Sequence, residues 1–196
     1  GDTVAIVGAG PVGLAAIMTA KLYTPGQIIA IDLAESRLAK AREFGADVTI
    51  DNGAEDAVAR IMELTDGLGV DVAIEAVGVP DTFELCTELV RPGGRIANVG
   101  VHGHPATLHL EKLWARDLTI TTGLVDTFTT PQLLKLVVDG RLDATAFATH
   151  RFPLDETMAA YDTFAAAADT HALKVVLEAE PVINVPALEE EALAVR

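Results

Sequence analysis

Three glycines near the start of the chain have the spacing of a phosphate-binding turn. Gly8, Gly10 and Gly13 follow the apolar run 3–7 and precede the stretch 14–22, whose apolar residues have helical spacing. Such glycines allow a tight bend, close approach of the backbone to a pyrophosphate, and close packing of helix on sheet. The helix N-terminus adds unpaired N–H groups and a partial positive charge that favour phosphate.

An acidic residue follows this turn at the distance expected of a dinucleotide-binding unit. Asp32 lies 19 residues after Gly13, at the end of the second apolar run. Its carboxylate is suited to accept hydrogen bonds from the hydroxyls of an adenosine ribose. A 2′-phosphate would meet a negative charge there, so the residues favour NAD over NADP.

Three other interpretations of this turn are open to comparison. Glycines at this spacing also form turns in folds that bind no nucleotide. S-adenosylmethionine-dependent methyltransferases share a glycine-rich first turn and a later acid, but Gly13 and the lack of a hairpin-type antiparallel last strand weigh against them. Short-chain dehydrogenases need a Tyr with a Lys four residues on, whereas Tyr161 is followed there by Ala165 and Tyr23 by Gln27.

The elements that must position these residues alternate regularly. Strand-like runs are predicted at 3–7, 28–33, 47–50, 70–77, 95–101 and 118–125, and helices at 14–22, 34–44, 54–64, 81–90, 110–116 and 131–138. The strands are apolar without polar alternation, as expected when both faces are covered. This pattern predicts an α/β fold, a doubly wound six-stranded parallel sheet of the Rossmann type. The strand 118–125 would form its edge.

The regular alternation of predicted strands and helices changes near residue 145. A strand at 147–152, an Ala-rich helix at 154–167 and a strand at 173–177 form a predicted C-terminal appendage. Beyond residue 179 the chain carries Pro181, Pro186 and three consecutive glutamates, which indicate a solvated acidic tail or one weak helix at 186–195. We therefore expect a nucleotide-binding domain at 1–145, an appendage at 146–179 and a tail at 180–196.

Composition excludes several classes of function. The 196 residues include 14 Lys and Arg against 29 Asp and Glu, a formal net charge of −15, which argues against nucleic acid and anionic membranes as partners. One cysteine, Cys86, rules out an intramolecular disulfide or a multi-cysteine zinc site within these residues. With no apolar run of about 18 residues, a soluble cytoplasmic protein is expected. The start at Gly1, without Met, favours a fragment.

Several motifs together resemble one family. They are 7–14 (VGAGPVGL), Asp32, 43–46 (EFGA), 67–71 (GLGVD), 75–78 (EAVG), 92–94 (PGG) and 99–100 (VG). Over about residues 1–178 the chain resembles the cofactor domain of zinc-dependent alcohol dehydrogenases, the medium-chain dehydrogenase/reductase family. The resemblance implies hydride transfer between an alcohol and NAD, with the alcohol, aldehyde or ketone oxygen bound to a catalytic zinc.

The resemblance also implies which residues contact the cofactor. The expected contacts are Gly8, Gly10, Pro11, Val12 and Gly13 at the pyrophosphate, Asp32 and Arg37 at the adenosine ribose, Val77, Val99, Gly100, Val101, Gly123 and Leu124 at the nicotinamide half, and Lys174 at the pyrophosphate. Arg37 and Lys174 are equally consistent with solvated charges, and Val77 and Val99 with core positions. Trp114 is expected close enough to report NADH by fluorescence.

One departure from the family limits what this chain can do. The family's catalytic half, with its zinc ligands, precedes this domain and is not in the sequence, so no catalytic residue and no metal ligand is expected here. Cys86 is interpreted as a small buried hydrophobe, and His102, His104 and His109 as loop histidines. The segment 146–179 would complete the missing half, so its apolar face carries a risk of self-association.

The predicted function is therefore cofactor binding without catalysis. The resemblance also implies a homo-oligomer, because in this family such edge strands can pair across a two-fold axis to extend the sheet. The rival interpretations are a stand-alone NAD-binding regulatory or assembly module and, more distantly, a methyltransferase.

Overall fold

The computed structural model describes residues 1–124 and 127–179. They belong to two compact units, Gly1–Thr145 and the residues from Ala146 onward. The predicted acidic tail, its weak helix and Val125 lie outside the described residues. No helix in the described part of the chain is long and apolar enough to cross a bilayer.

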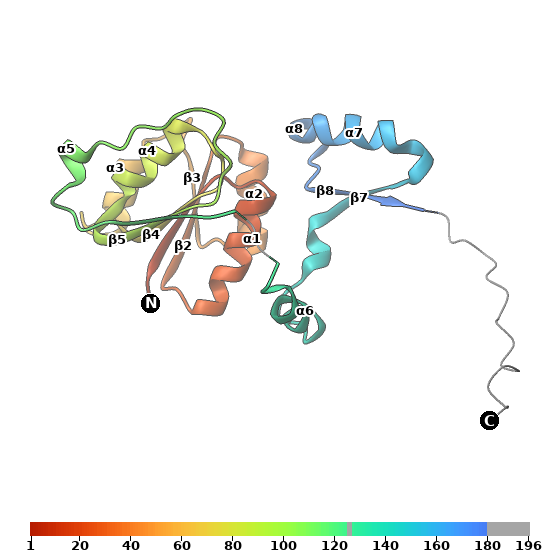
Figure 1. The fold of residues 1–196 in the computed structure, drawn as a ribbon, viewed down its shortest axis with the longest axis horizontal. Coiled ribbons are helices and arrows are strands. Elements are labelled where there is room, and N and C mark those ends of the chain that lie inside the picture. The colour runs from red at the N-terminus through yellow and green to blue at the C-terminus, as the bar shows by residue number, and fades with distance from the viewer. Residues whose placement is uncertain (125–126, 180–196) are drawn as a thin grey trace, which may run out of the picture. The chain divides into compact units, whose positions relative to one another are not determined.

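Six strands form one parallel sheet in the first unit (Figure 1). Their bounds are β1 (Thr3–Val7), β2 (Gln27–Asp32), β3 (Val48–Asp51), β4 (Val70–Glu75), β5 (Val90–Asn98) and β6 (Thr119–Thr122). The order β3-β2-β1-β4-β5-β6, with every neighbouring pair parallel, confirms the predicted doubly wound sheet. The order of the strands reverses between β1 and β4, and open α/β sheets bind ligands in the crevice outside the carboxyl ends of the strands at such a point.

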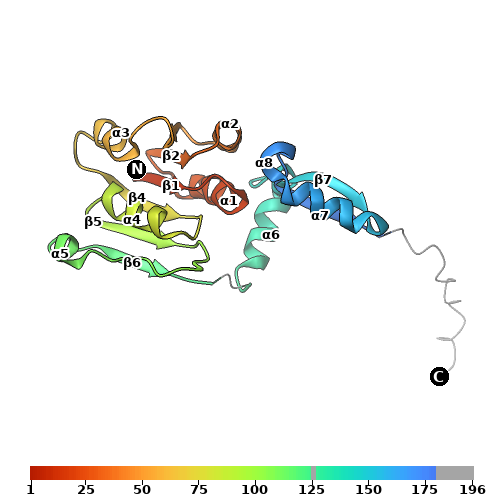
Figure 2. The ribbon, with the colours of Figure 1, turned by 90° about the horizontal axis from the view of Figure 1, so that it is seen from above.

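Helices cover both faces of this sheet (Figures 1 and 2). The covering helices are α1 (Pro11–Ala20), α2 (Glu35–Phe44), α3 (Ala57–Leu64) and α4 (Pro80–Leu89). Two further helices are α5 (Leu110–Leu113) and α6 (Thr130–Val138), and 3₁₀ turns lie at Lys21–Tyr23 and Ala144–Phe147. Helix α1 packs beside α2, and α3 beside α4. Since parallel crossovers are right-handed, the reversal at β1 places these two pairs on opposite faces.

The core explains why the strands lack polar alternation. Ile6, Ile29 and Ile96 are fully buried between the two helix layers, as expected of a sheet covered on both sides. Cys86 on α4 belongs to the same core. Burial, with the Glu75 carboxylate as a second cause, raises the pKa of its thiol, so Cys86 is the small buried hydrophobe that the sequence predicted.

Strand β5 differs from its predicted bounds at both ends. It begins at Val90 rather than Arg95, because Val70 pairs with Val90 and Val72 with Arg95. The extra residues between these pairs form an irregularity in which Gly93 has φ +72, a conformation that favours glycine. The strand ends at Asn98, so Val99 to Val101 form a loop rather than the end of a strand.

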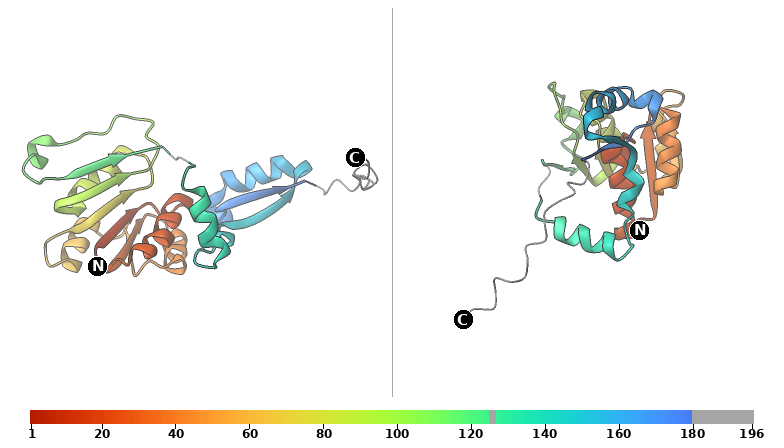
Figure 3. Two further views of the ribbon diagram at one scale, coloured as in Figure 1. Left: turned by 60° about the horizontal axis from the view of Figure 1, so that its bottom comes forward. Right: turned by 90° about the vertical axis from the view of Figure 1, so that its right-hand side faces the viewer.

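The second unit is a small strand–helix–strand element. Strand β7 (Ala148–Pro153) pairs in parallel with β8 (Lys174–Glu178). A 3₁₀ turn (Leu154–Glu156), α7 (Thr157–Ala165) and α8 (Ala167–Thr170) connect them. Helix α7 lies along one face of the two strands (Figure 3, left). The predicted strands and helix are all present.

Candidate cofactor-binding site

The glycine turn joins β1 to α1 in the geometry that close packing requires. Gly8 has φ +97, and a Cβ there would lie 2.5 Å from Val77 Cγ2. A Cβ on Gly13 would lie 1.8 Å from the Gly8 carbonyl oxygen, so any side chain at Gly13 would force the helix away from the turn. A Cβ on Gly10 would meet no atom within 4 Å. The backbone at Gly10 therefore faces open space, into which a ligand can approach closely.

Helix α1 begins without an acidic side chain of its own in the cap or first turn. Gly10 is its N-cap, no side chain caps it, and its first turn carries no acidic residue. By contrast, α3 is capped by the Asp56 carboxylate, and α2 and α4 carry Glu35 and Asp81 in their first turns. The amino end of α1 thus keeps its partial positive charge and first-turn N–H groups for an external anion.

Asp32, the last residue of β2, lies against the glycine turn. Its Oδ2 accepts a hydrogen bond from Ala9 N at 2.7 Å, and its Oδ1 accepts from Leu33 N at 2.8 Å and Ala34 N at 3.0 Å. Arg37 Nη1 lies 3.8 Å from Oδ2. Three donors leave a carboxylate with acceptor capacity for a fourth, so Asp32 can hold the turn and still receive a hydroxyl.

Aliphatic side chains are exposed around the crevice. They are Val12 at the start of α1, Leu33 after β2, Val77 after β4, Val99 and Val101 after β5, and Leu124 after β6. All follow or adjoin the carboxyl ends of strands, and Leu124 is 86% exposed. Apolar side chains gathered at a ligand-binding edge indicate a surface for planar rings.

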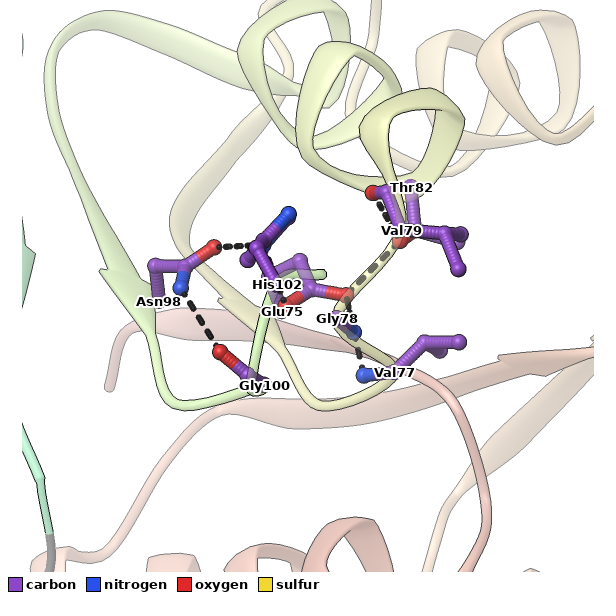
Figure 4. A network of polar contacts seen from close by, with 8 residues as sticks. All are labelled: Glu75, Val77, Gly78, Val79, Thr82, Asn98, Gly100 and His102. Atoms are coloured by element: carbon purple, nitrogen blue, oxygen red, sulfur yellow. Dashed lines mark hydrogen bonds and ion pairs between the residues drawn. The ribbon is translucent and has the colours of Figure 1, made fainter. Parts of the chain in front are cut away.

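A buried carboxylate supports this edge, and sequence reasoning gave it no role. Glu75, the last residue of β4, is fully buried. Its Oε1 accepts hydrogen bonds from Val77 N at 2.9 Å, Gly78 N at 2.8 Å and Thr82 Oγ1 at 2.7 Å (Figure 4). The signal was present in the sequence: one acid in an otherwise apolar strand end, which burial makes costly unless it is hydrogen-bonded.

His102 completes this network. Its Nε2 lies 2.9 Å from Asn98 Oδ1 and 3.5 Å from Glu75 Oε2, and Asn98 Nδ2 donates to Gly100 O at 3.2 Å (Figure 4). Its neighbours in the predicted histidine group lie elsewhere: His109 Nδ1 is 2.9 Å from Glu111 Oε1. The three histidines therefore do not converge.

The predicted contact residues fall into two groups. The glycine turn, Asp32, Arg37, Val77 and the loops after β5 and β6 all lie at the carboxyl edge of the first unit. Lys174 begins β8 in the second unit, so its contact with the pyrophosphate stays a prediction.

The structure does not support the prediction that Trp114 lies near the cofactor. Trp114 directly follows α5. Two residues further on, the Arg116 carbonyl oxygen accepts a hydrogen bond from Gly93 N at 2.7 Å, in the amino-terminal part of β5. Parallel strands put this edge opposite the crevice. The loop before α5 carries the chain from the carboxyl edge of the sheet back to the start of β6. Trp114 follows this loop and therefore lies away from the predicted cofactor site.

A zinc site has no support in the described residues. Among residues 1–124 and 127–179, no group of three or more His, Cys, Asp or Glu is placed to hold a metal ion. The residues in these two ranges do not fit a catalytic zinc.

Comparisons with known proteins identify the family of this chain. A family model described as zinc-binding dehydrogenase matches residues 11–139. An alcohol dehydrogenase of Cupriavidus necator is 40% identical over 169 residues, which cover 84% of this chain and 46% of that protein. The chain spans about half the length of the curated relatives it matches.

Solved structures agree as well. A zinc-dependent alcohol dehydrogenase 2 from Streptococcus pneumonia, in an apo form, superposes with a TM-score of 0.89 at 48% identity, covering 92% of this chain and 52% of that one. A structure described as a short chain alcohol dehydrogenase from E. coli CFT073, complexed with NADH, superposes with a TM-score of 0.82 at 26% identity, covering 90% of this chain and 52% of that one.

Proposed function

The chain belongs to the zinc-binding dehydrogenase family, and from this membership we propose that it is the NAD-binding part of an alcohol dehydrogenase. The observation that carries the proposal is the meeting of Asp32 with the glycine turn, where Asp32 Oδ2 accepts from Ala9 N at 2.7 Å. This contact joins the ribose-binding acid and the phosphate-binding turn in one site.

Each part of the site has a physical task in this proposal. The amino end of α1 holds the pyrophosphate through its N–H groups and its dipole. Asp32 accepts hydrogen bonds from the adenosine ribose and repels a 2′-phosphate, so NAD is preferred to NADP. Val77, Val99 and Val101 flank the nicotinamide half and exclude water from it. The bound nicotinamide supplies the hydride acceptor or donor.

The chain alone is proposed to bind cofactor without turning over substrate. The described residues offer no metal site, and in the family that the sequence resembles the zinc ligands lie in the other half. In the complete protein the substrate would be a small alcohol, or the aldehyde or ketone formed from it. We also propose a homodimer in which β6, at the end of the strand order, pairs with its copy.

A titration of the purified chain tests the proposal. NADH is expected to bind, with enhanced nicotinamide fluorescence, about tenfold or more tightly than NADPH, a difference of about 1.4 kcal/mol. S-adenosylmethionine is expected not to compete, in keeping with the parallel pairing of β6. Addition of zinc and ethanol is expected to produce no NADH from NAD. Absence of NADH binding, or zinc-dependent turnover by this chain, would contradict the proposal.

The stand-alone binding module is distinguished by a different observation. It has the same binding properties, but its gene would place an initiator codon directly before Gly1. A coding region upstream with Cys and His residues at the positions of a catalytic half would support the dehydrogenase instead.

A further inference from the structure

We propose that Glu75, Asn98 and His102 are positioning residues that fix the loop 99–101 against the nicotinamide half of the cofactor. This inference rests on the proposed function, because it assumes that the crevice binds NAD(H). In this proposal none of the three residues contacts the cofactor. They act through the backbone of the loop they hold.

Glu75 ties three segments together from one buried position. Its side chain accepts from the β4-exit loop and from Thr82 in the first turn of α4. Its backbone carbonyl oxygen accepts from Val99 N at 2.9 Å and Gly100 N at 3.1 Å in the β5-exit loop. Since β4 lies between β1 and β5 at the centre of the sheet, both exit loops are anchored to a central strand.

The two exit loops are also in direct backbone contact. A Cβ on Gly78 would lie 2.4 Å from Val101 O, and a Cβ on Gly100 would lie 2.3 Å from both Gly78 N and Glu75 Oε2. Neither loop can therefore move toward the other. Any displacement of the β5-exit loop must be outward, and a further contact is needed to restrain the loop in that direction.

His102 supplies this restraint. Because Asn98 Nδ2 donates to Gly100 O, Asn98 Oδ1 faces His102 as an acceptor, and His102 Nε2 must carry the proton between them. The second carboxylate oxygen of Glu75, Oε2, lies 3.5 Å from His102 Nε2. This oxygen is buried and has no hydrogen-bond partner among the described residues. The ring of Phe83, a residue of α4, contacts the His102 ring edge-on with 6.2 Å between the centroids, and this contact fixes the orientation of the His102 ring.

The loop is thus held at both ends, while its two valine side chains stay exposed. Asn98 and His102 hold the ends, and Val101 between them is 82% exposed. Large aliphatic side chains held rigidly in solvent cost free energy that burial against a ring would recover. A preorganised loop binds that ring without a further loss of conformational entropy.

Paired ligands distinguish positioning from general stability. NADH and ADP-ribose share the adenosine and pyrophosphate parts, but ADP-ribose lacks the nicotinamide. His102→Ala is expected to weaken NADH binding about tenfold and to leave ADP-ribose binding within twofold of wild type. His102→Gln, whose amide can place a donor near the position of Nε2, is expected to restore most of the NADH affinity. His104→Ala, an exposed histidine in the same loop, is the matched control and is expected to bind both ligands as wild type does.

A measurement on the unmodified chain covers the case in which His102→Ala does not fold. With ¹⁵N-labelled histidine, the His102 ring signals, assigned with the His102→Gln variant, are expected to shift on addition of NADH and not of ADP-ribose. Each of three results would overturn the inference. They are an unchanged NADH affinity in a folded His102→Ala variant, an equal loss of affinity for both ligands, and His102 ring signals that do not shift on addition of NADH. A wild-type chain that binds neither ligand would instead overturn the proposed function.

Discussion

Asp32 combines a structural and a recognition task in one carboxylate. Its side chain is 7% exposed, and it accepts three backbone N–H groups from the two loops that border the crevice. Bonds of this kind fix the direction of the carboxylate. Glu75 holds the β4-exit loop through its carboxylate and the β5-exit loop through its backbone carbonyl oxygen. At the scale of single residues, the site is built by acids at the ends of strands that organise the loops following them.

Asp32→Asn tests the recognition task. Removing the charge is expected to weaken NADH binding several-fold and to reduce the preference for NADH over NADPH by about tenfold, because a 2′-phosphate no longer meets a carboxylate. Fluorescence titrations with both nucleotides measure the ratio. Asp47→Asn is the matched control, since Asp47 also accepts a backbone N–H, from Ile28, but at the opposite end of β2. An unchanged ratio in Asp32→Asn would show that this carboxylate does not select the cofactor.

At the scale of elements, the β1–α1 connection separates folding from binding. Gly13 is required because the helix must approach the turn, whereas Gly10 faces open space. The same motif therefore contains one glycine whose role is packing and one whose role is access for a ligand. The two roles are measurable independently.

Substitution of these two glycines is expected to affect different properties, stability at Gly13 and NADH binding at Gly10. Gly13→Ala is expected to lower the free energy of unfolding by about 2 kcal/mol or more, because its methyl group would collide with the Gly8 carbonyl. Gly10→Ala is expected to change stability by less than about 1 kcal/mol and to weaken NADH binding at least tenfold, since the methyl group would stand where a pyrophosphate approaches. Urea unfolding and NADH titration measure the two. A Gly10→Ala variant that binds NADH normally would refute the assignment.

Asp71 links three strands and predicts a pH dependence of stability. From β4, its Oδ2 accepts from Thr3 N in β1 at 2.8 Å and its Oδ1 from Arg91 Nε in β5 at 2.6 Å. The Thr3 N–H and then the Arg91 guanidinium hold the pKa of the carboxyl below its usual range. A depressed pKa in the folded state means that the stabilisation is complete above the ordinary value of about 3.9 and is lost as the pH falls through the folded value.

Asp71→Asn is therefore expected to be less stable than wild type at pH 7 and more nearly equal to it in acid. The pair is partly exposed, so the difference at pH 7 is expected to be about 1 kcal/mol. It should shrink as the pH is lowered from about 4 toward 2. Chemical denaturation across this range measures it, with Asp2→Asn as an exposed control. A difference independent of pH would exclude the ionised pair as its cause.

At the scale of the whole molecule, the second unit exposes an apolar face. Met158, Tyr161 and Phe164 on α7 are 72%, 66% and 52% exposed. A hollow beside them is lined by Ala160, Tyr161, Phe164, Lys174, Val175 and Leu177. A contiguous apolar surface of this kind is a site for association, and the appendage was expected to carry one because its proposed partner is the other half of the protein.

Self-association of the isolated chain tests this expectation. The weight-average mass measured by light scattering is expected to rise with concentration, and a Met158→Ser, Phe164→Ser double variant is expected to associate less, because apolar area is removed from the contact. Tyr23→Ser is the control, since Tyr23 is an isolated aromatic residue in the first unit, 83% exposed. Identical masses for wild type and double variant at all concentrations would contradict the prediction.

Local features of the chain were sufficient to predict most of the fold. Unalternating apolar runs indicated buried parallel strands, and Gly45 indicated the end of α2, where it has φ +107. The glycine spacing and Asp32 indicated the phosphate and ribose ends of the site. All of these depend on periodicity or on short separations along the chain, which a sequence displays directly.

Contacts between distant segments decided the rest. Only the tertiary structure joined Glu75 to Asn98 and His102, extended β5 back to Val90 through its irregular pairing with β4, and placed Trp114 at the opposite edge of the sheet. The physical reason is that strand register and crossover path bring together residues that are tens of positions apart. The amino-acid sequence by itself determined which elements form and where a phosphate would bind; the packing of the sheet determined which side chains hold the loops around that site.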